Sequence, residues 1–258
     1  MACFIKGTGG APTENVEIRF KPDNCIDLIT GTQSIGQGHE TTFPQILASY
    51  FGIANELINL KQGDTNLIRT GGGHGSSRAT YMGGSAVYYA AENVIKKGTH
   101  LAANVLEVSA QDISFKNGIF LVDGTDRKID LFELAAIGER DGASLSTYNV
   151  WERQAMTFPN GAHAAELEVD SETGKVRLHR YLVVDDYGVI VNPLLVQGQV
   201  HGAIANGIGQ ALLEGVKFDP QTGQPLTGSF MDYALPKADD LVGYQIEFQG
   251  IPLSLIHI

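Results

Sequence analysis

The sequence predicts an α+β fold of β-hairpins with intervening helices. Two observations lead to this prediction: short segments alternate apolar and polar residues around turn-like sequences, and longer segments repeat apolar residues every three or four positions. With 258 residues, of which 43% are apolar and 18% charged, the chain is long enough to bury a core. It shows neither a clear linker nor a repeat of fixed period.

A β-hairpin is predicted near the N-terminus. Asn15–Phe20 and Cys25–Thr30 alternate apolar and polar residues on either side of a turn-like Lys-Pro-Asp-Asn segment. Leu57–Gln62 predicts a further strand, which leads into a glycine-rich segment at 71–75.

Between these strands, a short helix is predicted over Thr41–Phe51. Thr41 or Thr42 is a suitable N-cap and Gly52 a suitable stop. Because proline fits only in the first turn of a helix, Pro44 places the helix start near Thr42.

The longest helix is predicted from Ser77 to about Val108, where small apolar residues recur at four-residue spacing and Gly98 is expected to break or bend it. Ile113–Phe115 and Ile119–Val122 then flank Asn117-Gly118, a pair typical of a tight hairpin.

The second half of the chain begins with a short helix predicted over Asp130–Ile137. Ala165–Val169 and Val176–Val184 follow as strands, because both alternate in polarity on either side of a turn. The apolar run Tyr181–Val184 predicts a strand that is buried on both faces.

After Asn192-Pro193 we predict a helix with apolar residues at four-residue spacing and four interrupting glycines. Glycine costs about 1 kcal/mol relative to alanine within a helix. We therefore expect this helix to pack tightly against a flat surface. The apolar residues are Val196, Val200, Ile204, Ile208 and Leu212, and the glycines are Gly198, Gly202, Gly207 and Gly209.

Charge and composition exclude several classes of protein. The net charge is −11, from 18 Lys and Arg against 29 Asp and Glu, and no basic stripe is present, which argues against a nucleic-acid partner. No apolar run approaches the ~20 residues that span a bilayer, and no secretory signal follows Met1. Cys3 and Cys25 form neither a metal motif nor a disulfide framework. These features predict a cytoplasmic protein without a membrane partner.

Familiar catalytic motifs are absent from the sequence. The GGGHGSS segment at 71–77 lacks the lysine of an NTPase phosphate-binding loop, and no G-x-G-x-x-G opens a helix after a strand. There is no G-x-S-x-G elbow, and the histidines do not form H-x-x-x-H or H-E-x-x-H. Serine-hydrolase and zinc-protease chemistry therefore have no basis here.

Three glycine- and amide-rich segments remain, at residues 31–41, 71–81 and 197–202. In the first, Gly36-Gln37-Gly38 lets backbone N–H groups and a carboxamide face one ligand. In the second, Ser76-Ser77-Arg78 is available to phosphate oxygens. A glycine-rich segment usually only forms a turn. Three such segments with more hydrogen-bond donors than charged side chains, however, indicate a ligand that is a polyoxygenated, polycyclic anion.

These segments resemble the molybdenum-cofactor-binding subunit of the xanthine dehydrogenase / aldehyde oxidase family. The strings GTQSIGQGHET, GDTNLIRTGGGHGSSRATYMGGSA, VDDYGVIVNPLLVQGQVHGAIANGIGQALLE and LTGSFMDYALPKA occur in the family's order and spacing, over roughly residues 3–250. The resemblance implies an α+β molybdopterin-binding domain with mixed sheets over residues 1–258, subdivided at 1–160 and 161–258. It also implies the second cofactor-binding half of such a subunit, truncated at both ends.

By this resemblance, the chain is part of a molybdenum-dependent oxidoreductase. The family hydroxylates an aldehyde or N-heteroaromatic carbon with water-derived oxygen. The implied cofactors are molybdopterin, with the cytosine dinucleotide among its forms, and [2Fe-2S] clusters and FAD on partner domains or subunits. The implied partners are those modules, the N-terminal half of the same subunit and a small-molecule substrate.

The resemblance also implies cofactor-binding residues. Gln37 contacts the pterin, Ser76 lies nearest to the metal without a direct protein ligand to it, and Gln199 faces the molybdenum end of the cofactor. Whether His39 and His201 contact the cofactor is left open. The full implied set is Gly36, Gln37, Gly38, His74, Gly75, Ser76, Ser77, Arg78 and Gln199.

One family residue has no match. The general-base glutamate lies in a Gly-x-Gly-Glu motif beyond the Met231-Asp232-Tyr233 block, and neither Glu214 nor Glu247 matches it. No catalytic residue is therefore assigned, the apolar tail Ile251–Ile258 departs from the family pattern, and the isolated chain is expected to be inactive. The alternative is a non-catalytic binding or assembly module for a pyrophosphate-containing ligand.

Overall fold

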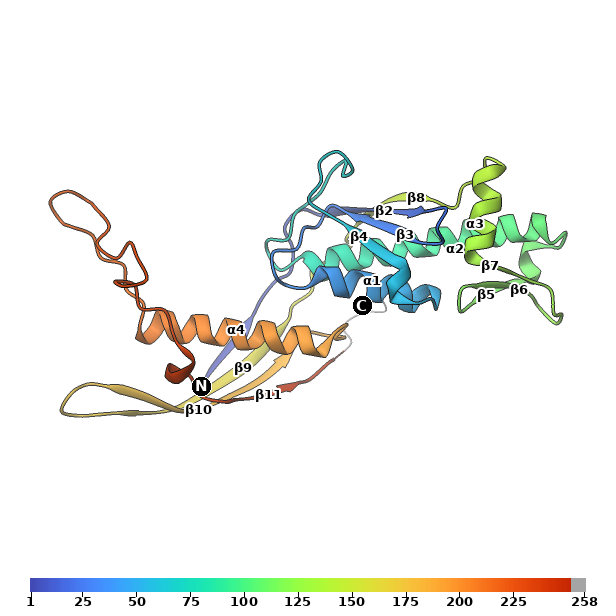
Figure 1. Cartoon of the computed structure of the whole chain (residues 1–258). Helices are drawn as coiled ribbons and strands as arrows, with labels where there is room; N and C mark the ends of the chain where they lie inside the picture. Colours follow the sequence, from blue (N-terminus) through green and yellow to red (C-terminus); the bar gives the residue numbers. More distant parts are fainter. Residues whose placement is uncertain (252–258) are drawn as a thin grey trace. The chain divides into compact units, whose positions relative to one another are not determined.

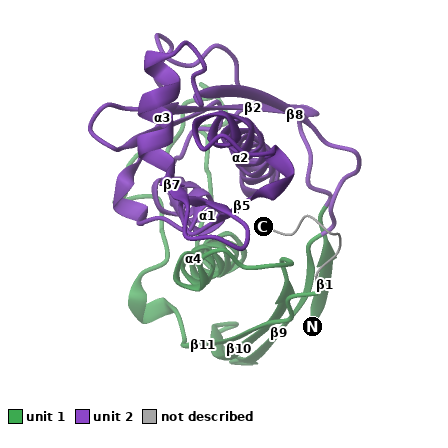
Figure 2. Ribbon diagram, turned by 90° about the vertical axis from the view of Figure 1, so that its right-hand side faces the viewer, with its two compact units in different colours: residues 1–6, 159–253 green, residues 7–158, 254–258 purple. Residues whose placement is uncertain are grey.

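A computed structural model describes residues 1–251, which form parts of two compact units (Figures 1 and 2). Among the described residues, unit 1 contains Met1–Lys6 and residues 159–251, and unit 2 contains Gly7–Phe158. The N-terminal strand, which the sequence patterns do not predict, thus belongs with the second half of the chain. Most of the tail singled out in the sequence, residues 252–258, lies outside the described part.

Unit 2 is built on a mixed four-stranded sheet and a smaller antiparallel sheet. Its strands are β2 (Thr13–Phe20), β3 (Ile26–Thr30), β4 (Ile58–Lys61), β5 (Ile113–Lys116), β6 (Ile119–Val122), β7 (Lys128–Asp130) and β8 (Thr147–Glu152). The larger sheet has the order β4-β3-β2-β8, in which only the β3–β4 pair is parallel. The smaller sheet has the order β5-β6-β7.

Helices pack against these sheets. The helices of unit 2 are α1 (His39–Phe51), η1 (Asn55–Leu57), the π-helix η2 (Ala79–Gly84), α2 (Ser85–Val105), η3 (Ala110–Asp112) and α3 (Leu131–Arg140). α1 and α2 contact one another, with α1 against β4 and α2 against β2 and β8. Both predicted hairpins and all three predicted helices of this region are present. The helix predicted from Ser77 starts later, however, as the π-helix η2, and α2 itself covers only Ser85–Val105.

The start of α1 differs from the prediction. The helix begins at His39 after Gly38, whose φ of +83° lies in the left-handed region, so Thr41 and Thr42 are inside it. Pro44 consequently lies in the second turn, where its missing N–H removes one helical hydrogen bond. Gly52 ends the helix in the left-handed conformation, as predicted.

Two glycine contacts define the packing of α2 and the β5–β6 hairpin. Gly98 does not break α2; a Cβ atom there would overlap the ring of Phe120, so glycine admits the aromatic side chain. The hairpin turns at Asn117 and Gly118, with φ of +49° and +74°. A Cβ atom on Gly52 would lie 2.5 Å from the Cα of Asn117, which seats this turn against the end of α1.

Unit 1 is a second mixed sheet, of order β1-β9-β10-β11, packed against one long helix. Its elements are β1 (Ala2–Ile5), β9 (Asn160–Val169), β10 (Val176–Asp186), α4 (Pro193–Leu212), η4 (Ala238–Asp240) and β11 (Tyr244–Phe248). Val200, Ile204 and Ile208 of α4 pack with Val183 of β10. Asn192 caps α4 by accepting a hydrogen bond from the N–H of Leu195 (3.1 Å).

For unit 1, one expectation is wrong and another is confirmed only for the apolar face of the helix. Leu182 and Val184 of β10 are 40% and 44% exposed, so in this unit the strand is buried on one face only. The apolar ladder of α4 does pack on the sheet, but a Cβ atom at three of the four glycines would meet nothing within 4 Å. The glycine positions on this open surface are Gly198, Gly202 and Gly207.

Candidate functional site in unit 2

The first two glycine-rich segments lie side by side in unit 2. A Cβ atom on Gly31 would lie 2.5 Å from the Cα of Gly71, so the two backbones touch. The side-chain amide of Asn15 holds Thr70 beside them, donating to its carbonyl oxygen (2.7 Å) and its hydroxyl (2.6 Å). The sequence thus predicted both segments, and the structure joins them at their bases.

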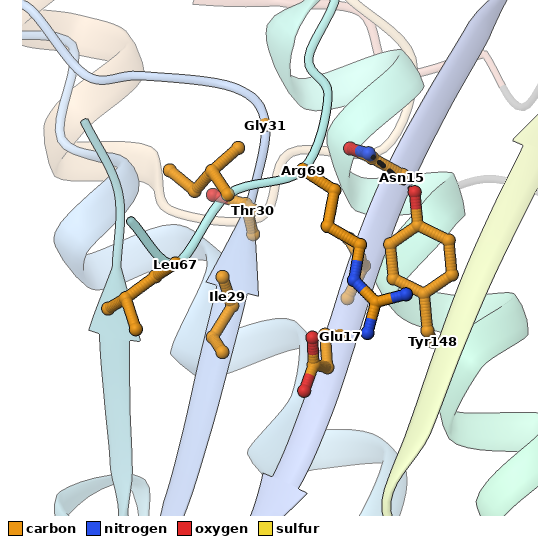
Figure 3. Close-up of a pocket in the computed structure, with 10 residues that line it drawn as sticks. Asn15, Glu17, Ile29, Thr30, Gly31, Leu67, Arg69 and Tyr148 are labelled. Atoms are coloured by element: carbon orange, nitrogen blue, oxygen red, sulfur yellow. Dashed lines mark hydrogen bonds between the residues drawn. The ribbon is translucent and has the colours of Figure 1, made fainter. Parts of the chain in front are cut away.

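A small cavity marks this junction (Figure 3). Its volume of about 10 Å³ admits about one water molecule and no cofactor. The guanidinium of Arg69 lies over the ring of Tyr148 at 4.8 Å, and Asn15 also donates to the hydroxyl of Tyr148 (3.0 Å). These contacts support the loops; the candidate binding surface is the part of the loops that extends beyond them.

The first loop is closed by side chains at its two ends. Glu40 accepts hydrogen bonds from Ser34 (2.9 Å) and Gln62 (2.8 Å), and Gln62 in turn accepts from the N–H of Ser34 (2.8 Å). The backbone N–H of Glu40 itself, followed by these side-chain donors, holds the pKa of Glu40 below its usual value. This carboxylate therefore stays ionised and fixes the loop.

Gln37 lies at the tip of this loop, and its carboxamide oxygen accepts from the N–H of Ile35 (2.6 Å). The –NH₂ group is the part of the side chain that can donate to a ligand. Gly38 follows as the N-cap of α1, which begins at His39 without a side-chain capping hydrogen bond. Its first N–H groups and the positive end of its dipole lie beside Gln37.

His39, the first residue of α1, is 1% exposed and stacks on Phe43 at 4.6 Å. Both of its ring nitrogens are buried without a hydrogen-bond partner in the described part of the chain. Burial, mainly, lowers the pKa of His39, and the charge of His74 lowers it further while Glu40 acts in the opposite direction. His39 therefore stays neutral.

The second loop contains backbone strain at two exposed residues. Ser76 and Ser77 have φ of +62° and +53°, both are exposed, and the π-helix η2 follows. Non-glycine residues adopt this conformation rarely, and such strain and π-helical turns concentrate at functional sites. The preceding Gly73 and Gly75 face open space, since a Cβ atom at either would meet nothing within 4 Å.

Arg78 is buried, although the preceding Ser76 and Ser77 are exposed. Its side chain is 1% exposed and paired with Glu14 at 2.6 Å, and it donates to the carbonyl oxygens of Gly73 (2.7 Å) and Thr13 (2.8 Å). The sequence interpretation offered this guanidinium to phosphate oxygens. The structure corrects that: the guanidinium is used inside the protein, and it shapes the loop.

Unit 1 contains the third segment. Gln197, Gln199 and His201 are exposed on α4, and the ring of His201 lies 5.2 Å from that of Tyr244. Unit 1 also has a cavity of about 310 Å³, with Gln199 outside its lining, which consists of Ala2, Cys3, Phe4, His163, Tyr181, Tyr187, Val200 and Ala203.

A buried polar network borders this cavity. The carboxylate of Asp185, fully buried, accepts from the hydroxyl of Tyr187 (2.6 Å) and pairs with His163 (3.2 Å). Burial and then this hydrogen bond raise the pKa of Tyr187. A Cβ atom on Gly161 would overlap Asp185, so glycine makes room for the carboxylate.

Sequence patterns missed two residues that organise the site, Glu14 and Thr32. Both are buried, at 2% and 0% exposed. The sequence pattern could have indicated Glu14, because this residue lies on the apolar face of β2, two positions before Val16 and four before Ile18. An acidic residue in that position requires a buried partner. Thr32 has no comparable pattern.

Within residues 1–251, no three His, Cys, Asp or Glu side chains gather as a metal-binding group. Over the same range, no helix combines the length and the apolar character that crossing a bilayer requires.

Comparison with known proteins places the chain in a family. The model of the molybdopterin cofactor-binding domain matches residues 1–242. The gamma subunit of the 6-hydroxypseudooxynicotine dehydrogenase complex of Paenarthrobacter nicotinovorans is 39% identical over 223 residues, which cover 84% of this chain and 28% of that protein. The carbon monoxide dehydrogenase large chain of Hydrogenophaga pseudoflava is 32% identical, over 97% of this chain and 32% of that one.

A solved structure gives the same result. The Cu,Mo-CO dehydrogenase in its carbon monoxide-reduced state matches with a TM-score of 0.90 and 30% identity, over 97% of this chain and 34% of that one. The chain thus spans about a third of the length of these relatives. With a family model over most of its length and an α+β fold that superposes on a solved member, the chain belongs to the molybdopterin cofactor-binding domains of the xanthine dehydrogenase / aldehyde oxidase family.

Proposed function

We propose that this chain is the part of a molybdenum-dependent hydroxylase that binds molybdopterin, and that its two joined loops form the binding surface in unit 2. The observation that supports this most directly is the pair of strained, exposed serines, Ser76 and Ser77, on a loop whose base touches the loop of Gln37. Backbone strain held in place by a buried network is typical of ligand-binding loops.

The residues present fit such a ligand. The open positions at Gly36, Gly73 and Gly75 leave room for a group to approach the main chain. The start of α1, without a side-chain cap, offers N–H donors to an anion, and Gln37, whose –NH₂ group is a donor, directly precedes its N-cap Gly38. Molybdopterin, when bound, supplies the redox chemistry of the enzyme.

Each residue would contribute in its own way. Gln37, with Gly36 and Gly38, would donate hydrogen bonds to the pterin. His74, Gly75, Ser76 and Ser77 would surround the pyrophosphate and dithiolene end through main-chain N–H groups and hydroxyls, with Arg78 acting from inside the loop. In unit 1, the carboxamide of Gln199 on α4 stays a predicted cofactor donor from the family resemblance. The residues that we propose for cofactor binding in unit 2 are Gly36, Gln37, Gly38, His74, Gly75, Ser76 and Ser77, with the buried Arg78 as a support of the second loop. Gln199 is the residue proposed for unit 1.

Several finer points belong to the same proposal. The cofactor would be molybdopterin or its cytosine dinucleotide form, and electrons would leave to [2Fe-2S] clusters and FAD on partner domains or subunits. Substrates would be aldehydes, N-heteroaromatic rings or another small molecule oxidised at carbon. We expect the protein to be cytoplasmic.

The proposal is tested by what the chain binds. We would express the 258-residue chain in a host that makes molybdopterin, and measure molybdenum and pterin per chain. In parallel, amide NMR shifts would be followed during titration with inorganic pyrophosphate and with CDP. We expect shifts at residues 36–38 and 74–77, and stronger binding of CDP if the dinucleotide form is preferred.

The outcomes separate the alternatives. A pyrophosphate compound bound without molybdenum or pterin, with shifts at the same loops, would support a non-catalytic binding module instead. A folded chain that binds none of these probes would contradict both interpretations. Ser171, in the exposed turn between β9 and β10, provides a matched control position where no shift is expected.

A further inference from the structure

One buried carboxylate connects the two loops of unit 2. The Oε2 atom of Glu14 accepts hydrogen bonds from the hydroxyl of Thr32 in the first loop (2.7 Å) and from Nη1 of Arg78 in the second (2.6 Å). Its Oε1 atom accepts from the N–H of Asn15 (3.0 Å). One side chain of β2 thus holds both loops through adjacent bonds on a single oxygen.

The arginine side of this network extends into the second loop. Nη1 of Arg78 also donates to the carbonyl oxygen of Gly73, and Nη2 donates to that of Thr13. Gly72 lies against the guanidinium, where a Cβ atom would overlap it. Gly9 closes the outer side, donating its N–H to the carbonyl oxygen of Ser76 (3.0 Å). The strained serines are therefore held between two fixed points.

The threonine side sets the position of the first loop. Thr32 is 0% exposed, and its hydroxyl is the donor that reaches Glu14 from this loop. A Cβ atom on Gly83 would lie 2.5 Å from the ring of Phe43 and 3.3 Å from the hydroxyl of Thr32. The chain following the second loop therefore also packs on the first loop and on α1.

Because the bonds from Glu14 to Thr32 and Arg78 are buried, they tolerate little change in geometry. The side chains of Glu14 and Arg78 are 0% and 1% exposed, so neither charge is compensated by water. Well-packed apolar residues often stabilise a core as well as a buried ion pair does, whereas removal of one partner leaves the other charge unpaired. Displacement of either loop would break a charge-assisted bond in a site that water does not reach.

From this we infer that Glu14 is a positioning residue, which sets the spacing of the two loops so that a change in one is transmitted to the other. Its importance for cofactor binding rests on the function proposed above; the mechanical coupling does not. Thr32, Glu14 and Arg78 are then a single unit that places Gln37 relative to Ser76.

Two backbone amides can report on this coupling in the unloaded chain. The N–H of Gly9 is bonded to the second loop at Ser76, and the N–H of Ser34 is bonded within the first loop to Gln62. Their hydrogen exchange, measured by NMR, reflects local opening of each loop. Amides in the middle of α2 report on global stability in the same experiment.

The test uses Thr32→Val, which removes the hydroxyl while keeping the shape of the side chain. We expect exchange of the Gly9 amide to accelerate by about 10-fold although Thr32 lies in the other loop, with α2 unchanged. Arg78→Lys keeps the charge but loses the planar fork, and should accelerate exchange at Ser34. Thr32→Ser, which keeps the hydroxyl, should behave as wild type. Glu17→Gln, on the same strand, is the matched control.

Two results would overturn the inference. In the first, Thr32→Val affects only the first loop. In the second, hydrogen exchange accelerates equally at all amides, including those of α2, which would indicate that Thr32 only contributes to global stability. Should Thr32→Val not fold, Thr32→Ala provides the same comparison.

Measurement of molybdenum and pterin in the same variants separates the two proposals. Coupled exchange in a chain that binds no cofactor leaves the inference standing and contradicts the proposed function. If the chain binds the cofactor but hydrogen exchange in the two loops is not coupled, the proposed function is supported and the inference about Glu14 is contradicted.

Discussion

Gly31 and Gly71 touch through their backbones: a Cβ atom on Gly31 would lie 2.5 Å from the Cα of Gly71. Neither glycine has a positive φ, so what the contact requires is the absence of a side chain. Since both sides are main chain, neither can yield by rotating a side chain. This contact keeps the ends of two loops together although 40 residues separate them in the sequence.

Gly71→Ala is expected to lower the free energy of unfolding by about 1–3 kcal/mol, as overpacking does in a closed site. Gly75→Ala is the matched control in the same loop, because a Cβ atom there meets nothing within 4 Å. Urea denaturation of both variants checks this. Equal stabilities would show that the two backbones can separate at little cost.

Ser77 should tolerate glycine but not a β-branched residue. Its φ of +53° disfavours any Cβ atom, and a branched one most. We expect Ser77→Val to be less stable than Ser77→Gly by about 1–2 kcal/mol. Ser171, exposed in a turn and without a positive φ, should show no such preference for glycine. Thermal and urea unfolding of Ser77→Val, Ser77→Gly, Ser171→Val and Ser171→Gly measures the difference in stability.

Two helical glycines should respond to alanine with opposite signs. Gly98→Ala places a methyl group in the ring of Phe120 and should destabilise unit 2 by about 1–3 kcal/mol, despite the better helix propensity of alanine. Gly207→Ala on α4 meets nothing within 4 Å and should stabilise that helix by up to about 1 kcal/mol. The double variant Gly98→Ala with Phe120→Leu should recover part of the loss; an additive result would contradict the contact.

His39 should make stability depend on pH. Burial lowers its pKa in the folded protein from an ordinary value of 6.5, so below pH 6.5 the unfolded chain binds more protons. Stability is then expected to fall as pH decreases below 6.5, and this loss should shrink in His39→Phe, which keeps the stacking on Phe43. Urea midpoints between pH 5 and 8 give the slopes. His100→Gln, at an exposed position of α2, should retain the wild-type slope.

Local patterns predicted much of this fold from the sequence, and their failures have physical reasons. Asn117-Gly118 and Gly52 were predicted correctly because turn and cap geometry depends on neighbouring residues alone. The start of α1 was not, because Gly38 takes a left-handed conformation that leaves Thr42 inside the helix. The pairing of β1 with β9 brings Ala2 opposite His163 and Ile5 opposite Asn160, and no local pattern encodes a contact over such a separation.

The site shows the same division. Glycine spacing and family resemblance pointed to Gln37 and Ser76, both on loops whose sequence is distinctive. Glu14 and Thr32, which connect those loops, were missed because their role depends on contacts across 64 and 18 positions of the sequence. Arg78 was noticed for its charge, yet only the fold shows that this charge is neutralised internally.

That neutralisation has a consequence for selectivity. With its cation paired inside the protein, the second loop would offer main-chain dipoles and hydroxyls, without a free guanidinium, to the anion that we propose as its ligand. Attraction by dipoles acts over short range and is less sensitive to ionic strength than attraction between full charges. Selectivity at this loop would then depend on how well the shape of a ligand matches the path of the backbone. Highly charged metabolites of the wrong shape would compete poorly, even at high ionic strength.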